Sequence, residues 1–136
     1  MSNLMWPVHD QVLEGSWEIA REILSRVDSI HQRLNRSLQY SNDREERASI
    51  REKRRTLQTY AILCERTWEL YEWARSDEAK AARPEHPWDT EPAAQSKYAE
   101  ALGLTKDEQP ISPMRGVIEL HQKLQEAFET GAELFY

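Results

Sequence analysis

Two long stretches of regularly spaced apolar residues constrain the fold of this chain more than any other feature. In residues 10–40 and again in residues 44–77, apolar positions recur at steps of three and four, which is the spacing of one face of an α-helix. Between them, Ser41, Asn42 and Asp43 supply turn and helix-capping chemistry. Because so short a connection makes consecutive helices antiparallel neighbours, we expect a long two-helix hairpin.

This spacing also predicts which positions of the hairpin face the core. The expected inward face of the first helix consists of Leu13, Trp17, Ala20, Leu24, Val27, His31, Leu34 and Leu38. A flanking stripe widens the apolar arc, so this helix should pack against two neighbours. The flanking stripe is Val12, Ile19, Ile23 and Ile30. The expected inward positions of the second helix are Ile50, Leu57, Tyr60, Ala61, Cys64, Trp68 and Tyr71.

The rest of the chain predicts a loop followed by two shorter helices. Three prolines within residues 79–92 cannot continue a helix, so we expect a proline-containing loop there. A short third helix is expected at about 91–102, and a C-terminal helix at about 113–135, where Ser112 precedes a proline. No segment predicts a β-strand. We therefore expect residues 1–136 to form a single all-α domain, a helical bundle.

Composition narrows the classes of protein to which this chain can belong. The longest strongly apolar run, residues 60–64, is five residues, whereas a membrane-spanning helix needs about 20. No secretory signal is visible at the N-terminus, so we expect a cytoplasmic protein without a membrane partner. Cys64 is the only cysteine, which excludes an intramolecular disulfide, and its inward position predicts a structural role.

The net charge of −6 is unevenly distributed along the chain. Residues 33–55 hold eight basic and four acidic side chains, or +4, while the remaining ten basic and twenty acidic side chains give −10. The five arginines of this segment that belong to the second helix lie at steps of about one turn along one side of it, and that side continues to Ile62, Arg66 and Trp73. Arginine and tryptophan are favoured in protein interfaces. The predicted partner-binding residues are Arg44, Arg47, Arg51, Arg54, Arg55, Ile62, Arg66, Trp73 and, in the proline loop, Trp88.

The same basic segment allows two other interpretations. Arginines followed by a tryptophan could bind phosphates and stack on a base of a nucleic acid. The acidic remainder would repel a duplex everywhere except at the end of the hairpin, so such binding would be local. Alternatively, the arginines form a solvated face with neighbouring glutamates, and Ile62 and Trp73 are covered by the proline loop and the third helix.

Two histidines, His31 and His121, fall on predicted apolar faces. Each follows an arginine, Arg26 or Arg115, by five or six positions. That spacing is similar to the Arg–His motif of small helical HEPN ribonucleases, in which arginine would stabilise a phosphate and histidine would exchange a proton. The polar residue usual after the arginine in that family is absent at both places. A metal site would need further ligands, so we expect structural histidines and predict no metal and no cofactor.

The remaining catalytic signatures are missing from the sequence. There is no glycine-rich phosphate loop, no paired-cysteine metal site and no nucleophile elbow. The sequence therefore favours a non-enzymatic protein–protein interaction module, such as an adaptor, an assembly subunit or a small inhibitor of the antitoxin, immunity or anti-defence type. The alternatives are a nucleic-acid-associated subunit using the basic end of the hairpin and a HEPN-like metal-independent ribonuclease. Association into a homo-oligomer is a further expectation, because apolar helices of a small bundle often complete their burial against a second copy.

Overall fold

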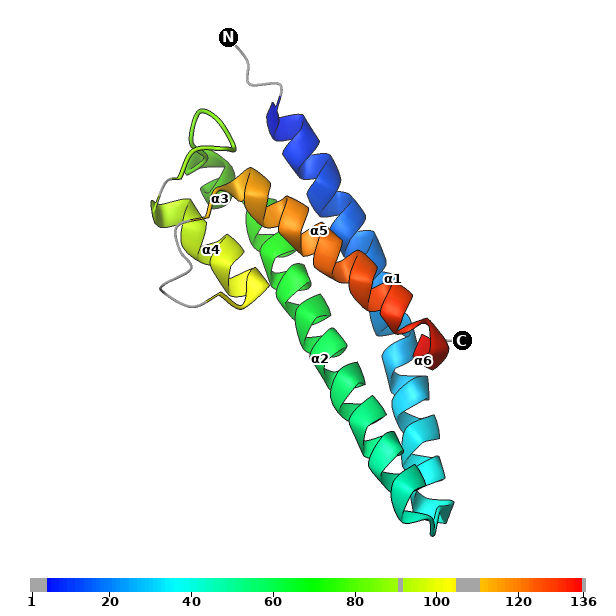
Figure 1. The fold of residues 1–136 in the computed structure, drawn as a ribbon. Coiled ribbons are helices and arrows are strands. Elements are labelled where there is room, and N and C mark those ends of the chain that lie inside the picture. Colours follow the sequence, from blue (N-terminus) through cyan, green and yellow to red (C-terminus); the bar gives the residue numbers. More distant parts are fainter. Residues whose placement is uncertain (1–4, 91, 105–110, 136) are drawn as a thin grey trace.

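The computed structural model describes residues 5–90, 92–104 and 111–135, and these residues form helices without any strand. Two long helices run antiparallel beside each other, and a shorter helix, α5, lies along the first of them (Figure 1). The all-α class and the long hairpin predicted from the sequence are thus confirmed. The helices are α1 (Met5–Tyr40), α2 (Arg44–Ala74), α3 (Asp77–Ala81), α4 (Pro92–Leu102), α5 (Pro113–Thr130) and α6 (Ala132–Phe135).

The turn of the hairpin is held by the side chains of Asp43, which precedes α2, and Arg47, in its first turn. The carboxylate of Asp43 accepts a hydrogen bond from the backbone N–H of Glu45 and so caps the start of α2. The guanidinium of Arg47 donates to the carbonyl oxygens of Leu38 and Ser41, at 2.5 and 3.0 Å, which satisfies acceptors left free at the end of α1. The two helix ends at the turn are therefore capped by residues only four positions apart.

The buried face of α1 differs from the predicted face. Ile23 and Ile30, expected on the flank, are buried, whereas His31, expected inward, is exposed. The reason is that α5 packs against the flanking side, where His121 lies beside Gly15. The packing of α5 thus moves the centre of the buried face of α1 away from the side that contacts only α2. The buried residues of α1 are His9, Leu13, Ser16, Ala20, Ile23, Ile30 and Leu34.

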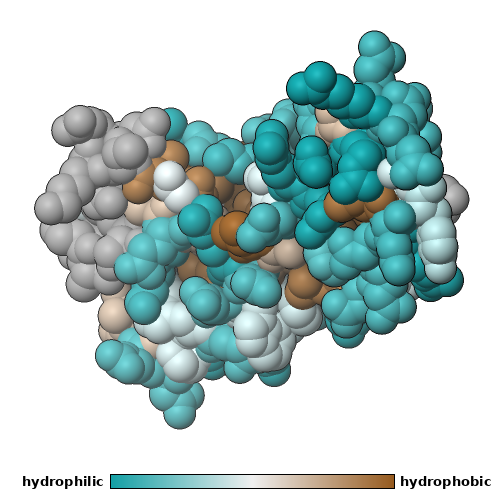
Figure 2. Space-filling view, turned by 90° about the horizontal axis from the view of Figure 1, so that it is seen from below, coloured by the Kyte–Doolittle hydropathy of each residue, from teal (hydrophilic) through white to brown (hydrophobic). Residues whose placement is uncertain are grey.

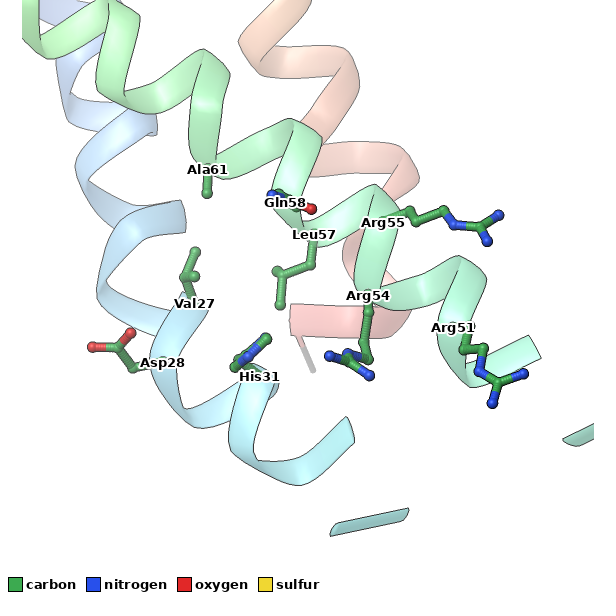
Figure 3. Close-up of a pocket in the computed structure, with 9 residues that line it drawn as sticks. All are labelled: Val27, Asp28, His31, Arg51, Arg54, Arg55, Leu57, Gln58 and Ala61. Atoms are coloured by element: carbon green, nitrogen blue, oxygen red, sulfur yellow. The ribbon is translucent and has the colours of Figure 1, made fainter. Parts of the chain in front are cut away.

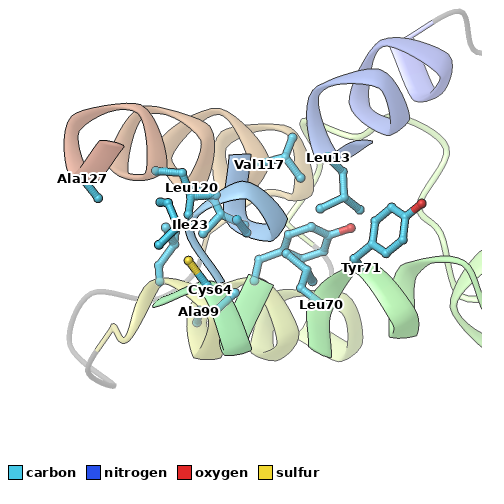
Figure 4. Close-up of a cluster of buried hydrophobic side chains, with 14 of the residues drawn as sticks. Leu13, Ile23, Cys64, Leu70, Tyr71, Ala99, Val117, Leu120 and Ala127 are labelled. Atoms are coloured by element: carbon cyan, nitrogen blue, oxygen red, sulfur yellow. The ribbon is translucent and has the colours of Figure 1, made fainter. Parts of the chain in front are cut away.

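The main core lies where α4 and α5 cover the hairpin, as Figure 4 shows. Cys64 is fully buried in this cluster, and burial raises the pKa of its thiol to about 12, in agreement with the expected structural role. Helices α4 and α5 approach closely because Gly116 has no side chain. A Cβ atom added there would lie 2.8 Å from the Cβ of Tyr98.

Three boundaries differ from those predicted, the first being the start of α1, which lies at Met5 rather than at about residue 10. The second long helix ends at Ala74 rather than 77, because the Ser76 side chain caps a separate short helix, α3, within the expected loop. The C-terminal helix is divided at Gly131, which follows the last residue of α5. Its start is as predicted, since the Ser112 side chain accepts a hydrogen bond from the backbone of α5. The expected first residue of the third helix, Glu91, lies outside the described residues.

Candidate functional site

A groove of about 630 Å³ lies between α1 and α2, toward the turn of the hairpin. All of its lining residues belong to these two helices, and Figure 3, which looks onto the groove, shows α5 and α6 behind them. We call this the α1/α2 groove and the side of the hairpin on which it opens the open face. The groove is lined by Val27, Asp28, His31, Arg51, Arg54, Arg55, Leu57, Gln58 and Ala61.

The groove combines an apolar floor with basic side chains. Val27 and Leu57 point into it, and the side chains of His31 and Arg54 approach each other across it (Figure 3). Arg51 and Arg55 extend outward from its rim, while Asp28 is directed away from Arg54. An acidic group entering this groove would meet guanidinium donors above an apolar surface.

The arginines at the groove have no acidic partner in the described part of the chain. The guanidinium groups of Arg51, Arg54 and Arg55 form neither an ion pair nor a hydrogen bond with any described residue. Arginine remains charged at all ordinary pH values, so three positive charges lie close together on one helix. Such a cluster favours carboxylates or phosphates, which guanidinium groups bind through two parallel hydrogen bonds.

Aromatic side chains extend the open face toward the other end of the hairpin. Trp17 of α1 and Trp68 of α2 have ring centroids 4.7 Å apart, and Trp68 is 43% exposed although it was predicted to be inward. One turn further along α2, Tyr71 stacks on Trp17 at 5.8 Å and donates a hydrogen bond to Glu14. The exposure of Trp68 could not be predicted from the sequence, because this residue occupies a heptad position typical of a core.

The structure separates the predicted partner-binding residues into groups. Arg51, Arg54 and Arg55 meet at the groove, and Arg44, Arg66 and Ile62 are exposed along the hairpin. Arg47 caps α1, as described above, and is partly buried. The other two predicted residues, both tryptophans, lie away from the groove.

Those two tryptophans occupy the end of the molecule opposite the turn. Trp73 is partly buried and packs edge-on against Tyr98 of α4, with centroids 6.1 Å apart, so it does not continue an exposed stripe. Trp88 is 52% exposed in the loop after α3. That loop is tied to α1 by a hydrogen bond from Trp6 to the carbonyl oxygen of Pro84. The predicted arginine and tryptophan face is therefore not continuous.

Neither arginine of the HEPN-like spacing is turned toward its histidine. Arg26 pairs with Glu22 at 2.6 Å, one turn before it and away from His31. Arg115 pairs with Glu119 at 2.8 Å within α5, while Nδ1 of His121 lies 3.3 Å from the Ser16 hydroxyl. The structure therefore provides no assembled pair of catalytic groups at these positions.

A buried polar network at the start of α1 was not anticipated. His9 is fully buried, and its ring nitrogens lie 2.9 Å from a carboxylate oxygen of Asp10 and 2.9 Å from the hydroxyl of Tyr98. Because a carboxylate only accepts, Nδ1 of neutral His9 donates to Asp10 and Nε2 accepts from Tyr98. Burial lowers the pKa of His9 and raises the pKa of Tyr98.

This network is structural rather than catalytic. Arg83 closes it by pairing with Asp10 at 2.7 Å and by lying over the ring of Trp6. The cavity beside Tyr98 measures about 10 Å³, which leaves no room for a substrate. A sequence signal did exist, because His9 lies four positions before Leu13 and so continues the inward spacing of the first helix.

No family model, curated protein or solved structure matches this chain. Among the described residues, no helix is both long and apolar enough to cross a membrane. The same residues contain no group of three or more His, Cys, Asp and Glu side chains that could hold a metal ion. A function is inferred from the α1/α2 groove and the arginines that line it.

Proposed function

We propose that this protein is a non-enzymatic protein–protein interaction module, of the adaptor, assembly-subunit or inhibitor type, that binds an acidic protein surface in the α1/α2 groove. The observation that supports this function best is the cluster of Arg51, Arg54 and Arg55, which lack acidic partners among the described residues, beside an apolar floor. Apolar contact with charge-assisted hydrogen bonds at its edge is the composition of a protein interface.

The distribution of charge favours an acidic protein over a nucleic acid. Arg54 and His31 face an apolar floor rather than a basic channel, and the chain outside residues 33–55 carries a net charge of −10. A nucleic acid needs basic contacts along its backbone, whereas an acidic side chain needs only a local site. A ribonuclease is disfavoured because Arg26 and Arg115 are each paired with a glutamate of their own helix.

The test is affinity capture from a lysate of the native source with three forms of the protein. The bait carrying Arg51→Glu and Arg54→Glu reverses the charge of the groove. The control bait Lys53→Glu introduces a negative charge on the same helix at an exposed residue that does not line the groove. All three should show the same helical circular dichroism.

We expect partner proteins that survive nuclease treatment to be retained by the wild type and by Lys53→Glu, and to be lost with the double variant. Identical protein lists for all three baits would remove the groove as a binding site. Loss of every partner on nuclease treatment would instead assign the basic end of the hairpin to nucleic acid.

A further inference from the structure

We infer that the acidic surface bound at the groove belongs to a second copy of this chain, and that two hairpins pack through their open faces in antiparallel orientation. This inference rests on the proposed function and identifies its partner. The structural basis is the charge pattern of the open face, which is complementary to itself under a two-fold rotation.

The open face of α2 is divided into a basic and an acidic half. Residues three or four positions apart lie on the same side of a helix, so Arg47, Arg51 and Arg54 are followed on that side by Gln58 and then by glutamates. These are Glu65, Glu69 and Glu72, all exposed and without an ion pair to any described residue. On this side, the half of α2 nearer the turn is therefore basic and the half farther from the turn is acidic.

If a two-fold axis crosses the middle of this face at right angles to α2, the two copies of α2 run antiparallel. The basic half of each copy then faces the acidic half of the other. With the axis between positions 61 and 62, Arg51 lies opposite Glu72 of the second copy, and Arg54 lies opposite Glu69 of the second copy. Gln58 then faces Glu65 of the second copy. A parallel arrangement would instead leave the arginines of both copies at one end of the bundle and the glutamates at the other, so these pairs would not form.

The charges on the open side of α1 are also complementary under a two-fold rotation, about an axis at nearly the same level of the hairpin. On its open side, Arg21 and Asp28 are exposed, seven positions apart, and neither has an ion pair with a described residue. An axis between positions 24 and 25 would pair each with the opposite charge of the second copy. Two contacts fix the register of the hairpin: Trp17 meets Trp68, and Arg47 reaches the carbonyl of Leu38. In this register Leu24 lies level with Ala61, so the axes required by α1 and α2 agree to within one residue, or about 1.5 Å along the hairpin.

The centre of this interface would be apolar. Leu24, Val27 and Ala61 are only partly buried in the single chain, and Trp68 is 43% exposed. Helices α4, α5 and α6 contribute nothing to the lining of the groove. Two such faces form a four-helix bundle in which the half-exposed apolar side chains are covered and the charges pair toward both ends, as in other bundles of antiparallel helices.

The mass of the protein in solution and a charge exchange test the arrangement. For a chain of 16.0 kDa, light scattering coupled to gel filtration should give twice that mass. Arg51→Glu with Arg54→Glu should give a monomer, and so should Glu69→Arg with Glu72→Arg, because each variant opposes like charges in its own dimer. Lys53→Glu should remain a dimer. Each double variant should raise the dissociation constant of the dimer by about tenfold or more.

The decisive step is to mix the two double variants. In the mixed dimer every reversed charge faces an opposite charge again, so the mixture should recover the mass of the dimer. A merely structural effect of the substitutions would not be reversed by mixing. A monomeric wild type, a dimer unaffected by either double variant, or a mixture that stays monomeric would overturn the inference.

The outcome also separates this inference from the proposed function. A monomeric wild type that still captures another protein through Arg51 and Arg54 would remove the dimer and leave the proposed function intact. A dimer that re-forms on mixing, together with identical captured proteins for all baits, would retain the dimer and remove the binding of any other protein at the groove.

Discussion

Two histidines of the same helix, His9 and His31, have opposite environments. His9 is fully buried beneath α4, and both of its ring nitrogens have partners. His31 is exposed at the α1/α2 groove, beside the half-buried Arg54. The difference arises from what covers each histidine, because α4 packs over the end of the hairpin at which His9 lies, whereas the groove beside His31 is lined by α1 and α2 alone. Polar side chains are satisfied within the chain at the covered end and are available to another molecule at the open face.

The largest expected effect tests whether side chains packed beneath α4 and α5 contribute more to the free energy of unfolding than side chains on the open face. Leu120 of α5 is fully buried, whereas Leu24 on the open face is only partly buried. Leu120→Ala should lower the free energy of unfolding by about 2 to 5 kcal/mol, since it loses apolar burial and leaves a cavity. Leu24→Ala should cost about 1 kcal/mol in dilute monomeric protein, because less of its surface is buried. Equal losses in urea titrations would contradict the comparison.

A second pair of substitutions concerns the contact of α5 with its neighbours. Gly116→Ala should destabilise the protein by about 1 to 3 kcal/mol, because its Cβ would lie 2.8 Å from the Cβ of Tyr98 and the two helices would have to move apart. Gly15→Ala is the matched control. Its Cβ would meet His121 at an ordinary 3.5 Å, so replacing a glycine within α1 should stabilise the protein by about 0.5 to 1 kcal/mol. Thermal unfolding of both variants measures the difference.

The buried histidine at the covered end, His9, should make the stability of the protein depend on pH. The pKa of His9 in the folded protein lies below its ordinary value of 6.5, so below that pH the unfolded chain takes up a proton that the folded chain does not. The contribution of neutral His9 to stability is therefore complete above pH 6.5. It is lost as the pH falls toward the folded pKa, at up to about 1.4 kcal/mol per pH unit.

Urea titrations at pH 7.5 and 5.5 detect this loss. His9→Gln should reduce the pH dependence, because glutamine does not titrate. An unaltered difference between the two pH values in His9→Gln would show that other groups, not the buried histidine, govern stability in this range.

The sequence predicted the hairpin because helical spacing over more than 30 residues is a local property of the chain. It did not predict which of two adjacent apolar stripes of α1 is the more buried. That choice depends on where α5 packs, and α5 lies about 100 residues later in the chain. Ile23 and Ile30 became core residues for this reason, and His31 became exposed. The division of the last helix had a visible signal in Gly131, since glycine commonly follows the end of a helix.

The candidate site was predicted only in part for a similar reason. The row of arginines was visible from spacing within one helix, and Arg51, Arg54 and Arg55 do meet at the groove. The apolar floor and His31 come from the facing helix, so their proximity depends on the register of the hairpin. Trp73 was misplaced because its neighbour, Tyr98, belongs to another helix. Contacts between elements far apart in the chain are not encoded in local spacing.

The smallest expected effect is the change in stability when an arginine is replaced, and it should differ between Arg26, which has an ion-pair partner, and Arg54, which has none among the described residues. Arg26 is bound to Glu22 on the surface of α1, so Arg26→Gln should cost about 0.3 to 0.5 kcal/mol, the usual value of an exposed pair one turn apart. Arg54 has no such partner among the described residues and lies near Arg51 and Arg55, so Arg54→Gln should leave the stability of the dilute monomer unchanged or raise it slightly. A loss with Arg54→Gln as large as that with Arg26→Gln would mean that Arg54 supports the fold. A neutral result would mean that the fold does not require this charge, as expected of a side chain that binds another molecule.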